Sequence, residues 1–241
     1  GPWPQNASVF PEVVIPGSPL AEKLEFGDER ASFAKAFPSV DKNEFTVYPV
    51  VDSIAWIERL LKCGVRTLQY REKHRSGKEL EDAIKKVIAL GREYQCQLFI
   101  NDHWQLAIQH GAYGVHLGQE DIEQADLQAI KSAGLRLGIS THGHYEMLKA
   151  LQYLPSYIAV GAIFPTRTKD MTGQIQGLRT LKDLVKFEPS IPKVAIGGIT
   201  PVNALDVKAT GVDSIAVVTA ITEAEDPEAV VVQLKDIMQC N

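Results

Sequence analysis

Carboxylates and amides follow two short apolar runs in this 241-residue sequence. Asn101 and Asp102 come directly after the apolar run 98–100, and Asp121 ends the polar segment 118–121. An oxygen-rich set without a cysteine or a histidine cluster is typical of Mg²⁺, which takes one or two carboxylates and completes its shell with water and phosphate oxygens. The pair Asp102 and Asp121 therefore predicts a magnesium site. For Asp121, capping of the helix that follows is the alternative.

A second group of residues combines cations with amide and hydroxyl side chains. Gln69, Arg71 and Lys73 alternate along the chain, so on a strand their side chains point to the same side. A solvated charged loop is the alternative for this run. The long loop at 164–177 suits phosphate and has the length of a lid, because it holds hydroxyls and cations in close succession: Thr166, Arg167, Thr168 and Lys169.

The elements that must position these groups alternate strictly. Short apolar runs predict strands, and amphipathic stretches between them predict helices. The predicted strands are 45–51, 66–71, 97–101, 113–117, 136–140, 157–161, 193–197 and 214–218. The predicted helices are 53–62, 77–94, 103–110, 122–132, 144–152, 178–187, 201–210 and 227–239.

Alternating strands and helices require a parallel sheet, because each helix serves as a crossover. The sheet could be open and doubly wound or closed into a barrel. No GxGxxG motif follows the first strand, where an open dinucleotide-binding sheet would place it. Eight repeats with polar residues after strand upon strand favour an α/β fold of the (β/α)8 TIM-barrel type, with eight parallel strands and the active site at their C-terminal ends.

In such a barrel the loops after strands seven and eight often bind phosphate through backbone N–H groups. Here those positions hold Gly197-Gly198 and Val218-Thr219. Two anion sites in one barrel mouth indicate two phosphorylated substrates or one bisphosphate. With Mg²⁺ present, pyrophosphate is the natural leaving group. An isomerase of a single sugar phosphate would instead need a base that titrates near neutral pH, and the carboxylates are predicted to bind metal.

Composition excludes several classes of protein. The sequence carries 25 Lys and Arg against 30 Asp and Glu, a net charge of −5, so no overall basic field attracts nucleic acid or anionic membranes. No stretch approaches the roughly 18–20 apolar residues of a membrane span. Three cysteines without a CxxC pair argue against a disulfide scaffold or a zinc ribbon and favour a reducing cytoplasm.

Residues 1–44 differ from the barrel domain predicted at 45–241. Six of the thirteen prolines lie in the first 40 residues, and the start lacks the features of a secretory signal. A short helix is possible at 19–37. We interpret this extension as an arm that packs on the barrel or is partly disordered, with a functional lid as the alternative. The sequence leaves the oligomeric state open, a homodimer included.

Several residues that could bind metal or react are interpreted as structural. His142 and His144 lie two apart without a third ligand, which disfavours zinc. His116 lies within a predicted strand and is interpreted as a hydrogen-bonded core histidine. Cys96 is assigned to packing and Cys240 to a tail.

Six motifs resemble thiamine phosphate synthases, in order and at similar spacing. They are QYREK (69–73), FINDHWQLAIQHGAYGVHLGQED (99–121), LGISTH (137–142), FPTRTKD (164–170), VAIGGI (194–199) and AVVTAI (216–221). The resemblance implies a transferase of thiamine biosynthesis that joins hydroxymethylpyrimidine pyrophosphate to a thiazole phosphate and releases pyrophosphate. It also implies a dissociative mechanism through a pyrimidine-stabilised cation.

The resemblance assigns roles to individual residues. Catalytic roles fall on Arg71, Lys73, Lys169 and Ser140, the last beside the pyrimidine. The pyrophosphate contacts and Mg²⁺ ligands fall on Gln69, Arg71, Lys73, Asn101, Asp102, Asp121 and Lys169. The thiazole-phosphate pocket falls on Thr166, Thr168, Gly198, Val218 and Thr219, where the Val-Thr pair departs from the more common Ile-Ser or Val-Ser.

Two alternatives share this fold. A thiazole tautomerase would have the same thiazole-phosphate pocket and a histidine that matches His142, but it needs neither metal nor pyrophosphate contacts. A non-catalytic phosphate-binding regulator would lack the metal carboxylates. Retention of Asp102, Asp121 and Lys169 favours the synthase.

Overall fold

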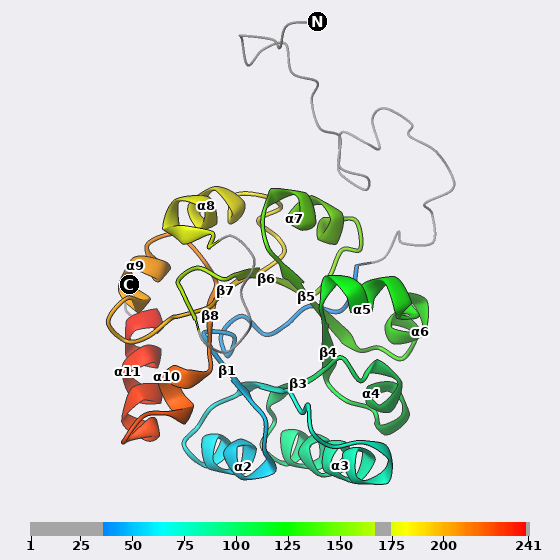
Figure 1. The fold of residues 1–241 in the computed structure, drawn as a ribbon. Coiled ribbons are helices and arrows are strands. Elements are labelled where there is room, and N and C mark those ends of the chain that lie inside the picture. Colours follow the sequence, from blue (N-terminus) through cyan, green and yellow to red (C-terminus); the bar gives the residue numbers. More distant parts are fainter. Residues whose placement is uncertain (1–35, 167–174, 240–241) are drawn as a thin grey trace, which may run out of the picture.

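The strands form a closed barrel in the computed structural model, which describes residues 36–166 and 175–239. Neighbouring strands are parallel and follow one another in chain order, and β8 pairs with β1 to close the ring (Figure 1). The predicted (β/α)8 barrel is confirmed. The strands are β1 (Val47–Val51), β2 (Thr67–Tyr70), β3 (Gln97–Asn101), β4 (Gly114–Leu117), β5 (Arg136–Thr141), β6 (Tyr157–Gly161), β7 (Lys193–Ile196) and β8 (Ser214–Val217).

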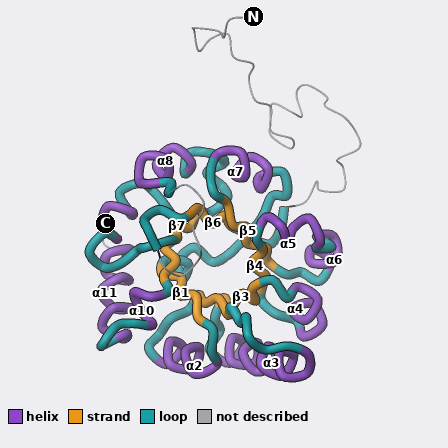
Figure 2. The backbone as a smooth tube through the Cα atoms, viewed as in Figure 1, coloured by secondary structure: helices purple, strands orange, loops and turns teal. Residues whose placement is uncertain are grey.

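Helices encircle the strands on the outside of the barrel (Figure 2). They are α2 (Ile54–Lys62), α3 (Gly77–Glu93), α4 (Trp104–His110), α5 (Gln119–Gln124), α6 (Leu127–Ser132), α7 (His144–Leu151), α8 (Gly177–Leu184), α9 (Ala204–Lys208), α10 (Thr219–Thr222) and α11 (Pro227–Gln239). Within the described ranges, none of these helices has the length and apolar character needed to cross a membrane.

The single helix predicted at 122–132 is wrong. The structure has two helices there, α5 and α6, because Ala125 adopts an extended conformation between them. The Asp126 side chain then accepts a hydrogen bond from the N–H of Ala129 at 2.9 Å and starts the second helix. A good capping residue therefore outweighed the continuous apolar spacing. The four-residue helix α10 was not predicted, since it is too short to show a helical period.

Two cores lie on the two sides of the strands. The larger core packs the helices against the outer face of the barrel. The smaller core fills the barrel interior with aromatic rings, among them Phe45, Tyr48, Phe99 and Tyr157. Their ring centroids lie 5.1–5.8 Å apart in tilted and edge-to-face pairs. This plug of rings forms a floor below the C-terminal strand ends.

Residues 36–46 close the opposite, N-terminal end of the barrel. The N–H of Phe37 donates to the carbonyl of Leu154 at 3.0 Å, and the N–H of Asp41 donates to Oε1 of Gln97 at 2.8 Å. Val40 and Phe45 are buried inside the barrel. The described end of the predicted extension, 36–44, thus packs on the barrel, while residues 1–35 and most of the possible helix at 19–37 lie outside the described residues.

Candidate active site

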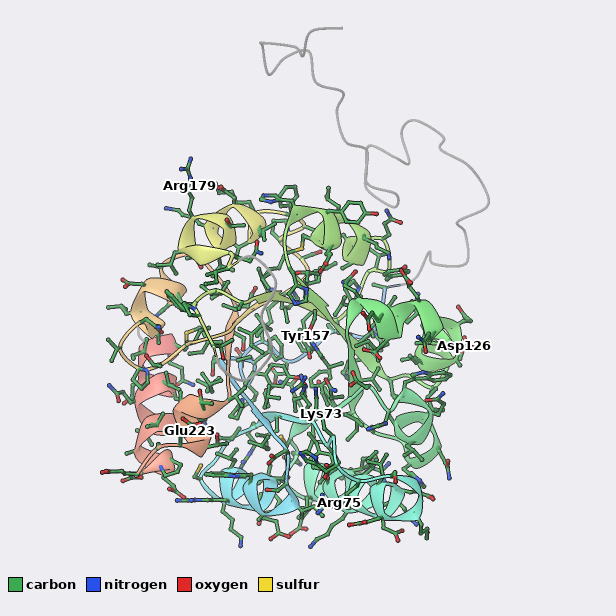
Figure 3. The ribbon with its side chains drawn as sticks, in the orientation of Figure 1. Lys73, Arg75, Asp126, Tyr157, Arg179 and Glu223 are labelled. Carbon is green, nitrogen blue, oxygen red and sulfur yellow. The ribbon has the colours of Figure 1, made fainter. Side chains whose placement is uncertain are left out.

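The C-terminal ends of the strands surround a cavity of about 650 Å³. Lys73 projects inside the ring of strands, whereas Asp126 and Arg179 lie out on the helices (Figure 3). The structure brings eleven predicted site residues together around this cavity: Gln69, Arg71, Lys73, Asn101, Asp102, Asp121, Ser140, Thr166, Gly198, Val218 and Thr219. Thr168 and Lys169 lie outside the described residues, so their roles stay predictions.

The carboxylates of Asp102 and Asp121 interact directly across the cavity wall. Burial of Asp102 and the charge of Asp121 raise the pKa of Asp102, and the guanidinium of Arg71 opposes this rise. Two half-buried carboxylates side by side repel each other unless a proton or a cation lies between them. The pair therefore has the electrostatic character of a cation site.

The structure contains the capping contact given as the alternative for Asp121, and the metal role stays a prediction. Its Oδ2 accepts a hydrogen bond from the N–H of Gly118 at 3.2 Å, which stabilises the start of α5. Because a carboxylate has two oxygens with several lone pairs, this contact leaves capacity for the interaction with Asp102. The capping contact fixes the orientation of the Asp121 side chain at the cavity wall.

Asp102 adopts a left-handed backbone conformation, with φ of 62°. This region is uncommon outside glycine, although aspartate tolerates it better than most residues. Two backbone hydrogen bonds hold it: Asp102 N–H donates to His116 O at 3.0 Å, and Trp104 N–H donates to Asp102 O at 2.8 Å. The sharp turn ends β3 and places the carboxylate at the cavity instead of continuing the strand.

Glu72 is a residue of the site region that the sequence reasoning missed. It lies between Arg71 and Lys73 but is buried on the other side of the strand end. Its Oε1 accepts the N–H groups of Lys73, His74 and Arg75, and its Oε2 pairs with the Arg75 side chain. Burial alone would raise the pKa of Glu72, but these hydrogen bonds lower it to about 2. Glu72 thus anchors the loop that carries the two cations.

Arg71 and Lys73 themselves form no ion pair with any residue that the structure describes. Arg75, by contrast, pairs with Glu72 and Glu79. The alternation predicted from the sequence is confirmed, since Gln69, Arg71 and Lys73 all line the cavity. The two cations remain available for an anion.

His116 is buried and hydrogen-bonded, which confirms its interpretation as a core histidine. It also lines the cavity, and its Nε2 lies 2.7 Å from the hydroxyl of Ser140. The Ser140 carbonyl accepts a hydrogen bond from Nε2 of Gln119 at 2.7 Å. The sequence could not reveal the contact between His116 and Ser140, because it joins two strands and depends on their register, in which His116 lies opposite Gly138.

A histidine and a glutamate lie at the rim of the cavity. Nδ1 of His142 and Oε2 of Glu146 are 2.9 Å apart, and Oε2 also accepts the N–H of His142 at 2.8 Å. His144 instead packs edge-to-face on Phe187, 6.2 Å between ring centroids. Burial raises the pKa of the Cys96 thiol to about 12, which confirms its packing role. Cys240 lies outside the described residues.

The loops after β7 and β8 supply backbone groups to the opposite wall. Gly198 has φ of +64°, and a Cβ there would lie 2.6 Å from the carbonyl oxygen of Pro165, so only glycine fits. Asn203 holds this turn by donating to Gly198 O at 3.0 Å and accepting from Thr200 N–H at 2.9 Å. Helix α10 begins at Thr219, and the first N–H groups of a helix lack partners within it. This wall can bind an anion through its backbone.

Comparisons with known proteins agree with this geometry. The family described as thiamine monophosphate synthase matches residues 47–221. A thiamine-phosphate synthase of Proteus mirabilis is 54% identical over 204 residues, which cover 85% of this chain and 94% of that protein. A thiamine-phosphate synthase of Klebsiella pneumoniae is 59% identical over 188 residues, or 78% and 89% of the two chains.

A solved structure gives the same result. The thiamine phosphate pyrophosphorylase from Pyrococcus furiosus superposes with a TM-score of 0.73 at 31% identity, covering 82% of this chain and 97% of that one. The family match spans β1 to α10 and therefore includes every wall of the cavity. The chain belongs to the thiamine monophosphate synthase family.

Proposed function

We propose that this chain is a thiamine-phosphate synthase, a transferase of thiamine biosynthesis. It would couple 4-amino-2-methyl-5-hydroxymethylpyrimidine pyrophosphate to 4-methyl-5-(2-phosphoethyl)thiazole and release pyrophosphate. With the carboxylated form of that thiazole, carbon dioxide would leave as well and a proton would take its place on the ring. The observation that carries the proposal is the joint placement of Asp102, Asp121, Arg71 and Lys73 in one cavity with a backbone anion wall. The names of the relatives support the same reaction.

The chemistry follows from the charges around the cavity. The bond between the pyrimidine methylene carbon and the pyrophosphate oxygen breaks first, and its electron pair leaves on that oxygen. The thiazole nitrogen then donates its lone pair to the ring-stabilised carbon cation. Arg71 and Lys73 act where negative charge develops on the leaving group, which is the interaction that lowers a barrier. No proton moves in either step, so no strong base is required.

The carboxylates fit Mg²⁺ as the cofactor. Within the described part of the chain, no group of three or more histidine, cysteine, aspartate or glutamate side chains could enclose a metal ion. An ion held by Asp102 and Asp121 would therefore complete its shell with water and substrate oxygens, as Mg²⁺ does. Bound there, it would supply positive charge to the departing pyrophosphate.

The remaining assignments belong to the same proposal. Ser140 would contact the pyrimidine, and Gln69 and Asn101 would contact the pyrimidine pyrophosphate. Thr166, Gly198, Val218 and Thr219 would bind the thiazole phosphate, with Thr168 and Lys169 completing the two anion sites. A cytoplasmic location and a homodimer remain predictions.

The test is incubation of the protein with both substrates, with and without Mg²⁺, and measurement of thiamine phosphate and pyrophosphate. The proposal expects equal amounts of the two products and a loss of both on chelation of Mg²⁺ by EDTA. Binding of the thiazole phosphate without coupling would contradict the synthase and favour a tautomerase or a regulator. Conversion between thiazole isomers without added pyrimidine, unaffected by EDTA, would identify the tautomerase.

A further inference from the structure

A chain of hydrogen bonds crosses the barrel interior below the cavity and joins Gln69 on β2 to Ser140 on β5. Nε2 of Gln69 donates to the hydroxyl of Tyr48 at 3.1 Å, and the hydroxyls of Tyr48 and Tyr157 lie 2.7 Å apart. His116 continues the chain: Nδ1 lies 2.7 Å from the Tyr157 hydroxyl and Nε2 lies 2.7 Å from the Ser140 hydroxyl. Gln69 and Ser140, the two ends, both line the cavity.

The barrel is built around this chain. Tyr157 projects from β6 into the middle of the ring of strands (Figure 3). A Cβ at Gly138 would lie 2.3 Å from its hydroxyl, so glycine at this position admits the phenol. The imidazole of His116 stacks on the Tyr157 ring, with 5.6 Å between centroids and 21° between planes. These contacts fix the positions of the middle members.

The number of protons on each group shows which group donates in each hydrogen bond between Gln69 and His116. Burial raises the pKa of both Tyr48 and Tyr157, so each hydroxyl keeps its one proton. Because the Gln69 amide nitrogen donates to Tyr48, the Tyr48 proton goes to Tyr157, and the Tyr157 proton goes to Nδ1 of His116. The reverse order would leave the buried Tyr48 proton without an acceptor among the described residues, which is costly.

We propose that this chain of hydrogen bonds determines which arrangement of donors and acceptors a ligand must present in order to bind in the cavity. His116 carries its proton on Nε2 and donates it to the Ser140 oxygen, which leaves the Ser140 proton for a ligand. Gln69 uses its nitrogen on Tyr48, which leaves its carbonyl oxygen as an acceptor.

The matching ring offers a nitrogen acceptor to Ser140 and an exocyclic amino group to Gln69, as a 4-aminopyrimidine does. The 4-oxo counterpart presents N–H and C=O in the opposite order and is rejected. Tyr48, Tyr157 and His116 are therefore positioning residues. This inference rests on the proposed function for the identity of the ring.

The first test measures which ring nitrogen of His116 carries the proton. We expect ¹⁵N NMR of the full-length protein to show the Nε2–H tautomer for His116, with its signals identified by their loss in His116→Gln. If that variant does not fold, Ser140→Ala identifies them by a shift, since it removes the acceptor of Nε2–H. An Nδ1–H tautomer overturns the proposal. The measurement does not depend on turnover, so it separates this inference from the proposed reaction.

The second test compares two ring chemistries. The 4-amino and 4-oxo pyrimidine pyrophosphates are compared by calorimetric Kd and by kcat/KM in the wild type, Tyr157→Phe and Tyr48→Phe. We expect a wild-type preference for the amino ring of about 100-fold or more, falling to within about 10-fold in the two variants. Tyr113→Phe is the matched control, because it removes a hydroxyl that bonds Gln97 at 2.5 Å at the other end of the barrel.

Full wild-type preference in Tyr157→Phe and Tyr48→Phe overturns the proposal, as does an equal loss of preference in Tyr113→Phe. If the amino ring binds preferentially but no thiamine phosphate forms, the proposed reaction is contradicted, and the inference about the chain of hydrogen bonds is still supported.

Discussion

The two ends of the barrel differ in how their polar side chains are paired. At the N-terminal end, Gln97 bonds to Asp41, Thr67 and Tyr113, and the ammonium of buried Lys193 donates to the carbonyls of Glu188 and Ile191 at 2.6 and 2.7 Å. At the C-terminal end, two carboxylates face each other and two cations have no ion-pair partner among the described residues. One end pairs these groups internally, and the other leaves charged groups facing the cavity.

This difference has a physical cause. Buried polar groups without partners are destabilising, so the internal hydrogen bonds of Gln97 and Lys193 add stability at the closed end. The open end keeps like charges together and a left-handed Asp102, both of which cost stability and are typical of binding sites. Substitutions at the open end should therefore change turnover, and substitutions at the closed end should change stability. Four predictions test this division, from the largest effect on turnover to the smallest.

Asp102→Asn and Asp121→Asn should each lower kcat roughly 10²- to 10³-fold, the range seen when one electrostatic contact to developing charge is removed. The melting temperature should hold or rise, because the substitution relieves the repulsion between the two carboxylates. Steady-state coupling kinetics across a Mg²⁺ titration provide the measurement. Asp126→Asn is the control, since asparagine also caps a helix and this residue lies on the outer helices. Unchanged kcat and Mg²⁺ dependence in both site variants would remove the metal assignment.

Gly198→Ala should weaken thiazole phosphate binding roughly 100-fold, because an added Cβ would displace the Pro165 carbonyl or the turn itself. The KM for the pyrimidine pyrophosphate should change much less, since its predicted contacts lie on the opposite wall. KM values for both substrates are measured. Gly134→Ala is the control: it has φ of +73° but open space around it, so it shares the backbone strain without the clash. Equal effects of the two variants would show that strain, and not the cavity wall, is responsible.

Glu72→Gln should lower kcat/KM about 10-fold by loosening the loop that carries Arg71 and Lys73. It should also change the dependence of stability on pH. The pKa of Glu72 lies at about 2 in the folded protein, below its ordinary value near 4.5, so its contribution is present above about pH 4.5 and is lost as the pH falls toward 2.

Urea unfolding at several pH values measures the contribution of Glu72. The wild type should lose its advantage over Glu72→Gln as the solution is acidified from pH 5 to pH 2. A constant difference across this range would contradict the role given to the carboxylate.

Gln97→Leu should leave kcat and both KM values unchanged while it lowers the free energy of unfolding by about 2 kcal/mol, since it removes the hydrogen bonds to Asp41, Thr67 and Tyr113. Thermal unfolding should show a melting temperature lower by roughly 4–8 °C for a protein of this size. A loss of turnover larger than the loss of folded protein would show that the two ends of the barrel are coupled.

Much of the site could be predicted because strand ends are visible in the sequence. Asp102 and Arg71 follow apolar runs, and in a parallel barrel all such positions meet at one edge. Glu72 was missed because neighbouring residues on a strand face opposite sides, and its role depends on N–H groups that turn back toward it in the folded loop. The break between α5 and α6 was missed because capping by Asp126 competes with apolar spacing, and only the packed structure shows which of the two prevails.

Local patterns in the sequence were enough to predict the eight strands, the barrel that their alternation with helices requires, and the chemistry available at its C-terminal end. These follow from local periodicity and from the residue types after each strand, which do not depend on distant partners. Which polar groups are paired and which face the cavity depends on contacts in the folded protein. Only strand register brings His116 against Ser140 and Tyr157, and only closure of the barrel brings Tyr48 of β1 to Tyr157 of β6. Contacts between residues far apart in the chain require the folded geometry, because sequence spacing carries no information about them.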